Sequence, residues 1–188
     1  MSQSKAAKLP TEPEAGSRIR ILCWCIAIAF GLAQALASRH TMQADGISYL
    51  DMGDAIIRRD WKMAINGCWS PLYPWLQGLA AWAIKPSPYW QFTLVHLVNL
   101  LIYVFALACF DTLLQALATG GLAGRTSEVF GCTFSRRALP AIGYVVFIWS
   151  SLGLITLEEV SPDMLMAGFV YLAAWLLVRI AKQPAKGF

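Results

Sequence analysis

The stretch IRILCWCIAIAFGLAQALA, residues 19–37, decides the fold class of this chain. It carries no acidic residue, and Gln34 is its one internal amide. A helix needs about 20 mainly apolar residues to cross the hydrocarbon core of a bilayer. We therefore predict that residues 19–37 span a membrane as a helix.

Three more stretches follow the same pattern, at residues 90–116, 138–157 and 163–180. The second of the four predicted spans contains His96 and Asn99, and helix–helix hydrogen bonds explain such buried polar groups better than substrate contacts. Asp111, near the inner end of that span, is expected to reach water. The sequence predicts an all-α integral membrane protein with about four transmembrane helices.

The composition agrees with a membrane protein. Hydrophobic residues make up 57% of the 188 residues and charged residues 14%, whereas soluble domains carry about 25% charged residues. The formal net charge is +4, but the basic residues are dispersed, which argues against nucleic-acid binding. Five cysteines without a C-x-x-C pair and two histidines give no zinc framework.

The segment PLYPWLQGLAAWAI, residues 71–84, is too short to span and carries aromatic residues that suit the headgroup level. With a cytoplasmic N-terminus, the positive-inside rule favours this segment lying on the surface. The predicted order is a disordered cytoplasmic tail (1–18), an outer loop (38–89) with interfacial helices at about 46–61 and 71–84, an inner loop (117–137), an outer loop (158–162) and a cytoplasmic tail (181–188). The alternative, in which 71–84 spans, places the basic inner loop and C-terminal tail outside.

Two local patterns concern the first helix. Ala27, Gly31 and Ala35 form a small-residue stripe that lets another helix approach closely, so we expect a helix–helix partner there. The tripeptide at residues 35–37 resembles a signal-peptidase site, so cleavage of the first helix is an alternative.

Acidic residues gather on the predicted outer side. Asp45 is expected to cap the helix at 46–61, and Asp54 with Arg58 forms a favourable i, i+4 ion pair. A second acidic group, Glu158, Glu159 and Asp163, lies at the last outer loop. An acid-rich surface at the membrane boundary suits a polar, partly anionic substrate, but the charge pattern taken alone favours the simpler interpretation of solvated loops.

The order of these motifs resembles the N-terminal part of the GT-C superfamily of membrane glycosyltransferases. The residues that carry the likeness are Asp45-Gly46-x-x-Tyr49, Arg59-Asp60-Trp61, the SPLYPWL segment at 70–76 and the acidic loop at 157–163. The closest likeness is to the branch of protein mannosyltransferases and the lipid A aminoarabinose transferase. Family members carry about twice as many helices or more, and several have Asp-Glu where this chain has Asp45-Gly46.

The resemblance implies an inverting enzyme with a polyprenyl-phosphate-linked sugar as donor. Asp45 matches the family's catalytic base toward the acceptor hydroxyl. Arg58, Arg59 and Lys62 are candidates for the leaving phosphate by location. Glu158, Glu159 or Asp163 would orient the acceptor, and Asp45, Glu158 and Glu159 are a candidate set for a divalent metal ion.

Two other readings stay open. A non-catalytic membrane scaffold, assembly protein or pseudoenzyme needs only the helices and their packing. A transporter fragment would use His96 and Asn99, but transporters place their ionisable groups at mid-membrane, whereas the acidic residues here lie in loops. The expected location is a bacterial inner membrane, with membrane lipids around the helices.

Overall fold

The computed structural model describes residues 12–65, 67–119 and 138–182. These residues form helices and connecting loops, with no strand among them. Most of the predicted tails and the predicted loop at 117–137 lie outside the described residues. Where the predicted tail at 1–18 is described, it is already helical, because the first helix begins at Glu12.

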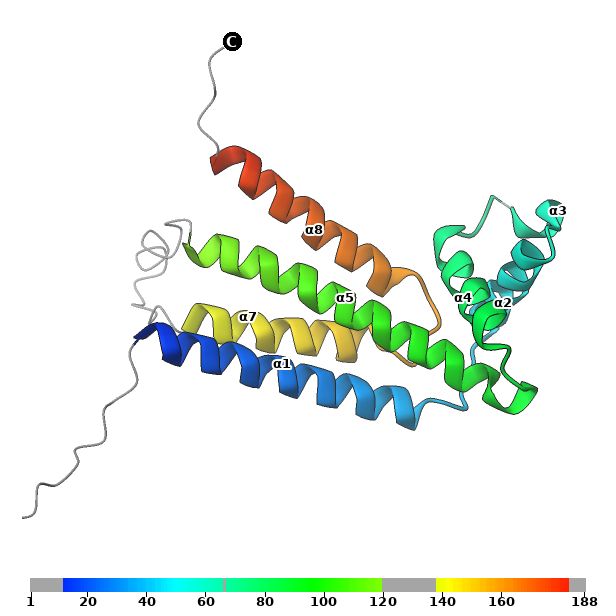
Figure 1. The fold of residues 1–188 in the computed structure, drawn as a ribbon, viewed down its shortest axis with the longest axis horizontal. Helices are drawn as coiled ribbons and strands as arrows, with labels where there is room; N and C mark the ends of the chain where they lie inside the picture. The colour runs from blue at the N-terminus through cyan, green and yellow to red at the C-terminus, as the bar shows by residue number, and fades with distance from the viewer. Residues whose placement is uncertain (1–11, 66, 120–137, 183–188) are drawn as a thin grey trace, which may run out of the picture.

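Four long helices lie side by side and alternate in direction (Figure 1). They are α1 (Glu12–Ala37), α5 (Gln91–Thr119), α7 (Ala138–Trp149), which continues as the π-helix η3 (Ser150–Ile155), and α8 (Asp163–Lys182). Helix α5 packs against α1, α7 and α8, and α8 packs chiefly against α5. The loops at 38–43 and 156–162 therefore meet at one end of the bundle.

Three of these helices are long and apolar enough to cross a membrane: Ser17–Ala37, Pro88–Ala118 and Asp163–Lys182. The fourth apolar stretch, Pro140–Ile155, is shorter. The prediction of an all-helical chain with helices suited to membrane spanning is thus confirmed for the described residues, while the count of four spans stays a prediction.

The small-residue stripe of α1 faces α5. Ala27 and Ala35 are buried, and a Cβ atom added to Gly31 would lie 2.8 Å from the Tyr103 ring. The Tyr103 hydroxyl donates a hydrogen bond to the carbonyl oxygen of Ala27 at 3.1 Å. The helix that approaches this stripe is therefore α5 of the same chain.

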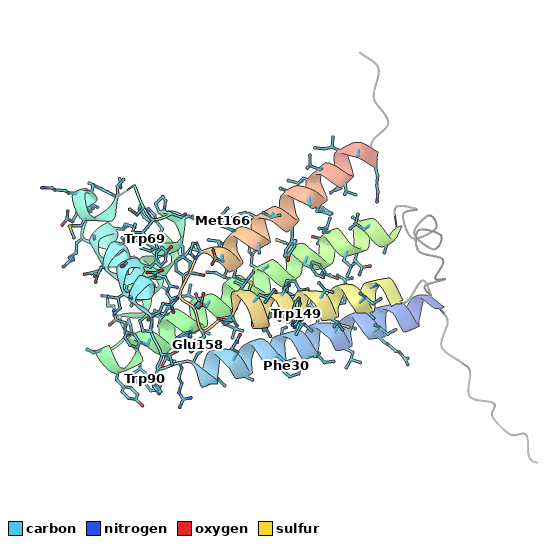
Figure 2. The ribbon with its side chains drawn as sticks, turned by 180° about the vertical axis from the view of Figure 1, so that it is seen from behind. Phe30, Trp69, Trp90, Trp149, Glu158 and Met166 are labelled. Carbon is cyan, nitrogen blue, oxygen red and sulfur yellow. The ribbon has the colours of Figure 1, made fainter. Side chains whose placement is uncertain are left out.

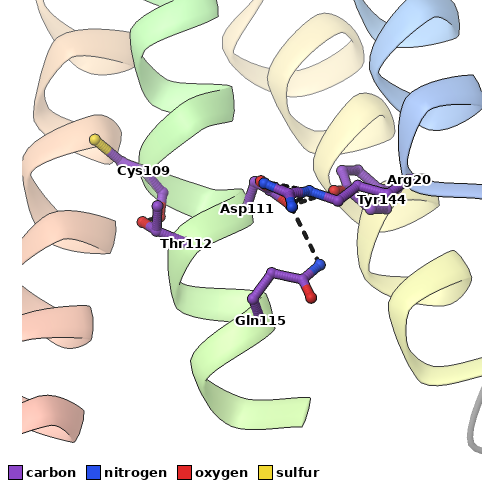
Figure 3. Close-up of polar contacts among 6 residues, drawn as sticks. All are labelled: Arg20, Cys109, Asp111, Thr112, Gln115 and Tyr144. Carbon is purple, nitrogen blue, oxygen red and sulfur yellow. Dashed lines mark hydrogen bonds and ion pairs between the residues drawn. The ribbon is translucent and has the colours of Figure 1, made fainter. Parts of the chain in front are cut away.

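An ion pair between the half-exposed Arg20 and the buried Asp111 joins α1 to α5 at the other end of the bundle, where Tyr144 of α7 also contacts Asp111 (Figure 3). The carboxylate of Asp111 accepts from Nε of Arg20 at 3.0 and 3.1 Å, and the Tyr144 hydroxyl donates to it as well. The Asp111 side chain is only 2% exposed. The expectation that Asp111 reaches water is wrong, because its partners come from the two neighbouring helices.

A second group of helices lies at the end of the bundle where α1 ends (Figure 1). It contains α2 (Ala44–Ile57), α3 (Trp61–Ala64), α4 (Leu72–Ile84) and the short 3₁₀ helix η1 (Pro88–Trp90). Helices α2 and α4 cross where glycines touch, since a Cβ atom on Gly78 would lie 2.5 Å from the carbonyl oxygen of Gly53. This contact fixes α2, and with it Asp45, relative to α4.

The predicted helix at 46–61 is two helices in the structure. Helix α2 ends at Ile57, with Arg58 as its C-cap, and the next residue, Arg59, adopts a left-handed φ of 61°. The Asp60 side chain then caps α3 by accepting a hydrogen bond from the backbone amide of Met63. The predicted ion pair between Asp54 and Arg58 is confirmed, at 2.9 Å.

Candidate functional site

One cavity brings together residues from both predicted outer loops. It has a volume of about 540 Å³ and is lined by Thr41, Met42, Gln43, Asp45, Thr156, Glu158 and Glu159. Glu158 lies at the end of the bundle next to α2, α3 and α4 (Figure 2). The carboxylate of Asp45 thus shares one polar pocket with those of Glu158 and Glu159, which lie far from it in the sequence.

Asp45 reaches this cavity from the first turn of α2. The prediction that Asp45 caps the helix is wrong, because the helix begins one residue earlier and Gln43 is the capping residue. Asp45 remains well placed, since a carboxylate in the first turn is favoured by the helix dipole. Its side chain is exposed and faces the cavity.

Two buried side chains of α5 hold the cavity walls. The Nε2 and Nδ1 atoms of His96 lie 3.0 Å from the carbonyl oxygens of Thr41, which lines the cavity, and of Leu157, which lies between the lining residues Thr156 and Glu158. Nδ2 of Asn99 donates to the carbonyl oxygens of Leu157 and Glu159 at 3.4 and 3.3 Å. The prediction of helix–helix hydrogen bonds is confirmed for Asn99, which accepts from Tyr73 of α4, but it is wrong for His96, whose two partners are loop carbonyls.

Further polar side chains complete this support. Gln34 of α1 donates to the carbonyl oxygen of Leu152 and accepts from the amide of Leu157, both at 3.0 Å. The Tyr73 hydroxyl of α4 donates to Oδ1 of Asn99 at 2.6 Å and accepts from Nε2 of Gln77 at 2.9 Å. The sequence marked Gln34 and Gln77 only as polar interruptions of apolar segments, which was the one available signal.

The side chains of α5 that support the cavity walls lie below the start of that helix. His96 and Asn99 lie five and eight residues after Gln91, the first residue of α5, which corresponds to roughly 8–12 Å at the helical rise of 1.5 Å per residue. His96 and Asn99 therefore lie below the first turn of a helix long enough to span a membrane.

Negative charge extends from the cavity toward α8. Burial raises the pKa of the Tyr49 phenol, and the charges of Asp163 and Asp45 raise it further. Asp163, at the first residue of α8, accepts a hydrogen bond from the Ser161 hydroxyl at 3.1 Å. Asp163 is thus near this acidic region, although it does not line the cavity.

The three predicted phosphate ligands lie elsewhere. Arg58, Arg59 and Lys62 are exposed around the break between α2 and α3, and Arg58 is paired with Asp54. None of them lines the cavity, and no other basic residue does so among the described part of the chain. The structure therefore places the predicted acidic residues together and leaves the predicted basic residues outside.

The predicted metal site does not form. Within residues 12–65, 67–119 and 138–182, no three His, Cys, Asp or Glu side chains are grouped closely enough to hold a metal ion. Asp45, Glu158 and Glu159 share the cavity without converging on one point, so we propose no metal.

The wall after η3 has an unusual backbone. The chain leaves α7 through a π-helix and then reaches Thr156, which has φ 61° and ψ 153°. π-helical turns and strained backbone are both frequent at functional sites. No pattern in the sequence indicated either feature.

Comparison with known proteins leaves the family open. No protein-family model, no curated protein and no solved structure matches this chain. The resemblance to GT-C enzymes therefore remains a prediction, and the cavity geometry is the basis for the function proposed next.

Proposed function

We propose that this chain is a GT-C-like glycosyltransferase module. It would transfer a sugar from a polyprenyl-phosphate-linked donor to an acceptor hydroxyl at the outer face of a bacterial inner membrane. The observation that supports this proposal is the single cavity that Asp45 shares with Glu158 and Glu159.

The cavity suits a sugar-sized polar ligand. Its volume of about 540 Å³ lies within the range of roughly 300–1,000 Å³ that is typical of small-molecule sites. Ionised carboxylates are acceptors only, so they pair with the hydroxyl groups of a sugar or an alcohol.

The chemistry assigns one role to each wall. In the transfer step the acceptor oxygen attacks the anomeric carbon, the bond from that carbon to the phosphate oxygen breaks, and Asp45 takes the hydroxyl proton. A carboxylate within hydrogen-bond reach of the hydroxyl can act as this general base. Glu158 and Glu159 would hold the acceptor from the opposite wall, and we assign no role to Arg58, Arg59 and Lys62.

The proposed topology has four spans and a cytoplasmic N-terminus. The alternating directions of α1, α5, α7 and α8 support it, since they put the cavity and helices α2–α4 at one end. Pro140–Ile155 would reach roughly 24 Å at the helical rise, so as the fourth span it would be shorter than the hydrocarbon core of about 30 Å.

Cysteine labelling tests the topology. In a cysteine-free background, Asp60→Cys and Ser161→Cys should react with a membrane-impermeant thiol reagent added outside, and Glu128→Cys should not. Labelling of Glu128→Cys but not Ser161→Cys would mean that residues 71–84 span, which removes the proposed outer site.

A transfer assay tests the activity. Purified protein in lipid vesicles would receive radiolabelled polyprenyl-phosphate hexoses and alcohol acceptors. Asp45→Asn should reduce transfer by about 10²–10⁴-fold, the usual contribution of a general base. Asp51→Asn is the matched control, because Asp51 is exposed on the same helix and does not line this cavity. Full activity in Asp45→Asn would refute the assignment.

A non-catalytic scaffold or pseudoenzyme is the second candidate. It is favoured by the absence of a basic residue among the described residues of the lining, since a leaving phosphate needs neutralisation. Wild-type protein that binds the lipid-linked sugar without transferring it would support this candidate instead.

A further inference from the structure

Thr156 occupies a backbone conformation that glycine alone adopts readily. Its φ of 61° and ψ of 153° lie in a region that is essentially restricted to glycine. Threonine is β-branched, so its side chain crowds the backbone more than most residues would. A positive φ at such a residue is a genuine outlier that needs support from its surroundings.

The neighbouring residues supply this support on both sides. On one side, the amide of Thr156 donates to the carbonyl oxygen of Ser151 at 3.0 Å, which closes the π-helical turn. On the other side, Leu157 is fixed by Gln34 through its amide and by His96 and Asn99 through its carbonyl oxygen. The strained conformation is thus imposed by bonds to α1, α5 and η3.

The Thr156 side chain has a specific contact within the cavity wall. Its Oγ1 accepts a hydrogen bond from the backbone amide of Glu159 at 3.2 Å. This bond closes a short turn that contains Glu158 and ends at Glu159, and all three residues line the cavity. Glycine at position 156 would remove the strain and would also remove this bond.

We propose that Thr156 is a positioning residue, which holds Glu158 and Glu159 toward the cavity and is retained there despite the strain. The inference rests on the proposed function, in which these carboxylates hold the acceptor. Thr156 would act through the two glutamates, and its removal should weaken acceptor binding more than it slows the transfer step.

The test compares three variants in full-length protein in lipid vesicles. Thr156→Gly removes the strain and the hydroxyl, whereas Thr156→Ser keeps the hydroxyl. Thr41→Gly is the matched control, because Thr41 lines the same cavity and its hydroxyl donates to the carbonyl oxygen of Ser38 at 2.8 Å, without a positive φ. Thermal unfolding, amide hydrogen exchange and transfer kinetics would be measured for each.

Thr156→Gly should unfold at a temperature no lower than the wild type, whereas Thr41→Gly should unfold at a lower one. The Glu159 amide should exchange at least tenfold faster in Thr156→Gly and at the wild-type rate in Thr156→Ser. The acceptor KM should rise at least tenfold in Thr156→Gly, with a smaller change in kcat, and Thr156→Ser should restore it.

Two results would overturn the inference. An unchanged exchange rate of the Glu159 amide in Thr156→Gly would show that the hydroxyl does not hold this turn, whether or not the wild type is a transferase. A wild-type acceptor KM in Thr156→Gly, in a protein that transfers sugar, would show that the turn does not position the acceptor. Failure of the wild type to transfer at all would count against the proposed function, and the exchange and unfolding results would still decide the role of Thr156.

Discussion

Replacing Gly78 by alanine tests how tightly α4 fixes the helix that carries Asp45. The added Cβ atom would lie 2.5 Å from the carbonyl oxygen of Gly53 and 3.0 Å from its Cα atom. Ordinary contacts begin near 3.4 Å, so the two backbones must part by roughly 0.9 Å. Because both partners are backbone atoms, no side-chain rotation relieves the contact.

The expected cost follows from two opposing effects. Overpacking a close contact costs about 1–3 kcal/mol, and replacing a helical glycine by alanine returns about 0.5–1 kcal/mol. We expect a net destabilisation of about 1–2 kcal/mol, measured by denaturant unfolding in mixed micelles. Transfer should also fall, since parting α2 from α4 shifts Asp45 relative to the wall that carries Glu158.

Gly67→Ala is the matched control. No atom lies within 4 Å of the Cβ position at Gly67 and its φ is not left-handed, so we expect no loss of stability. If Gly78→Ala proves as stable as Gly67→Ala, the close crossing of α2 and α4 does not exist in solution. Asp45 would then not be positioned by this crossing.

Two further predictions concern buried polar groups. Arg20→Met should destabilise the protein by on the order of 3 kcal/mol, because it leaves the Asp111 carboxylate buried without its cation. Adding Asp111→Asn should regain most of that loss in the same unfolding assay. Equal stability of the single and double variants would refute the ion pair. Burial raises the pKa of the Tyr73 phenol, so the stability that its neutral form provides is fully present below about pH 10 and is lost as the pH rises above it. Unfolding midpoints across that range should fall more steeply for the wild type than for Tyr73→Phe, and parallel curves would contradict this.

The sequence predicted the helices well where a long apolar run marked them. Helices α4, α5 and α8 begin and end within three residues of the predicted limits, whereas α1 ends at the predicted residue but begins at Glu12 instead of residue 19. The break between α2 and α3 was missed, since the apolar pattern continues through Arg58 to Trp61 while the backbone turns at Arg59. A positive φ at an arginine leaves no signal in composition.

The candidate site was predictable only in part. The carboxylates Asp45, Glu158 and Glu159 stood out as acidic residues on one predicted face, and the structure places them around one cavity. The residues that hold the cavity were not predictable as a group, because His96 and Gln34 act on backbone carbonyl and amide groups of distant loops. Such contacts depend on tertiary packing, which a single sequence does not encode in any local pattern.

The central place of α5 has a consequence for how the chain assembles during synthesis. Among the described helices, α1 is made before α5, which is the next of spanning length and packs against it. Helices α7 and α8 emerge later, and each meets α5 already in place as its neighbour. The order of translation therefore matches the order of contact, because each later helix packs against α5, which is made before it.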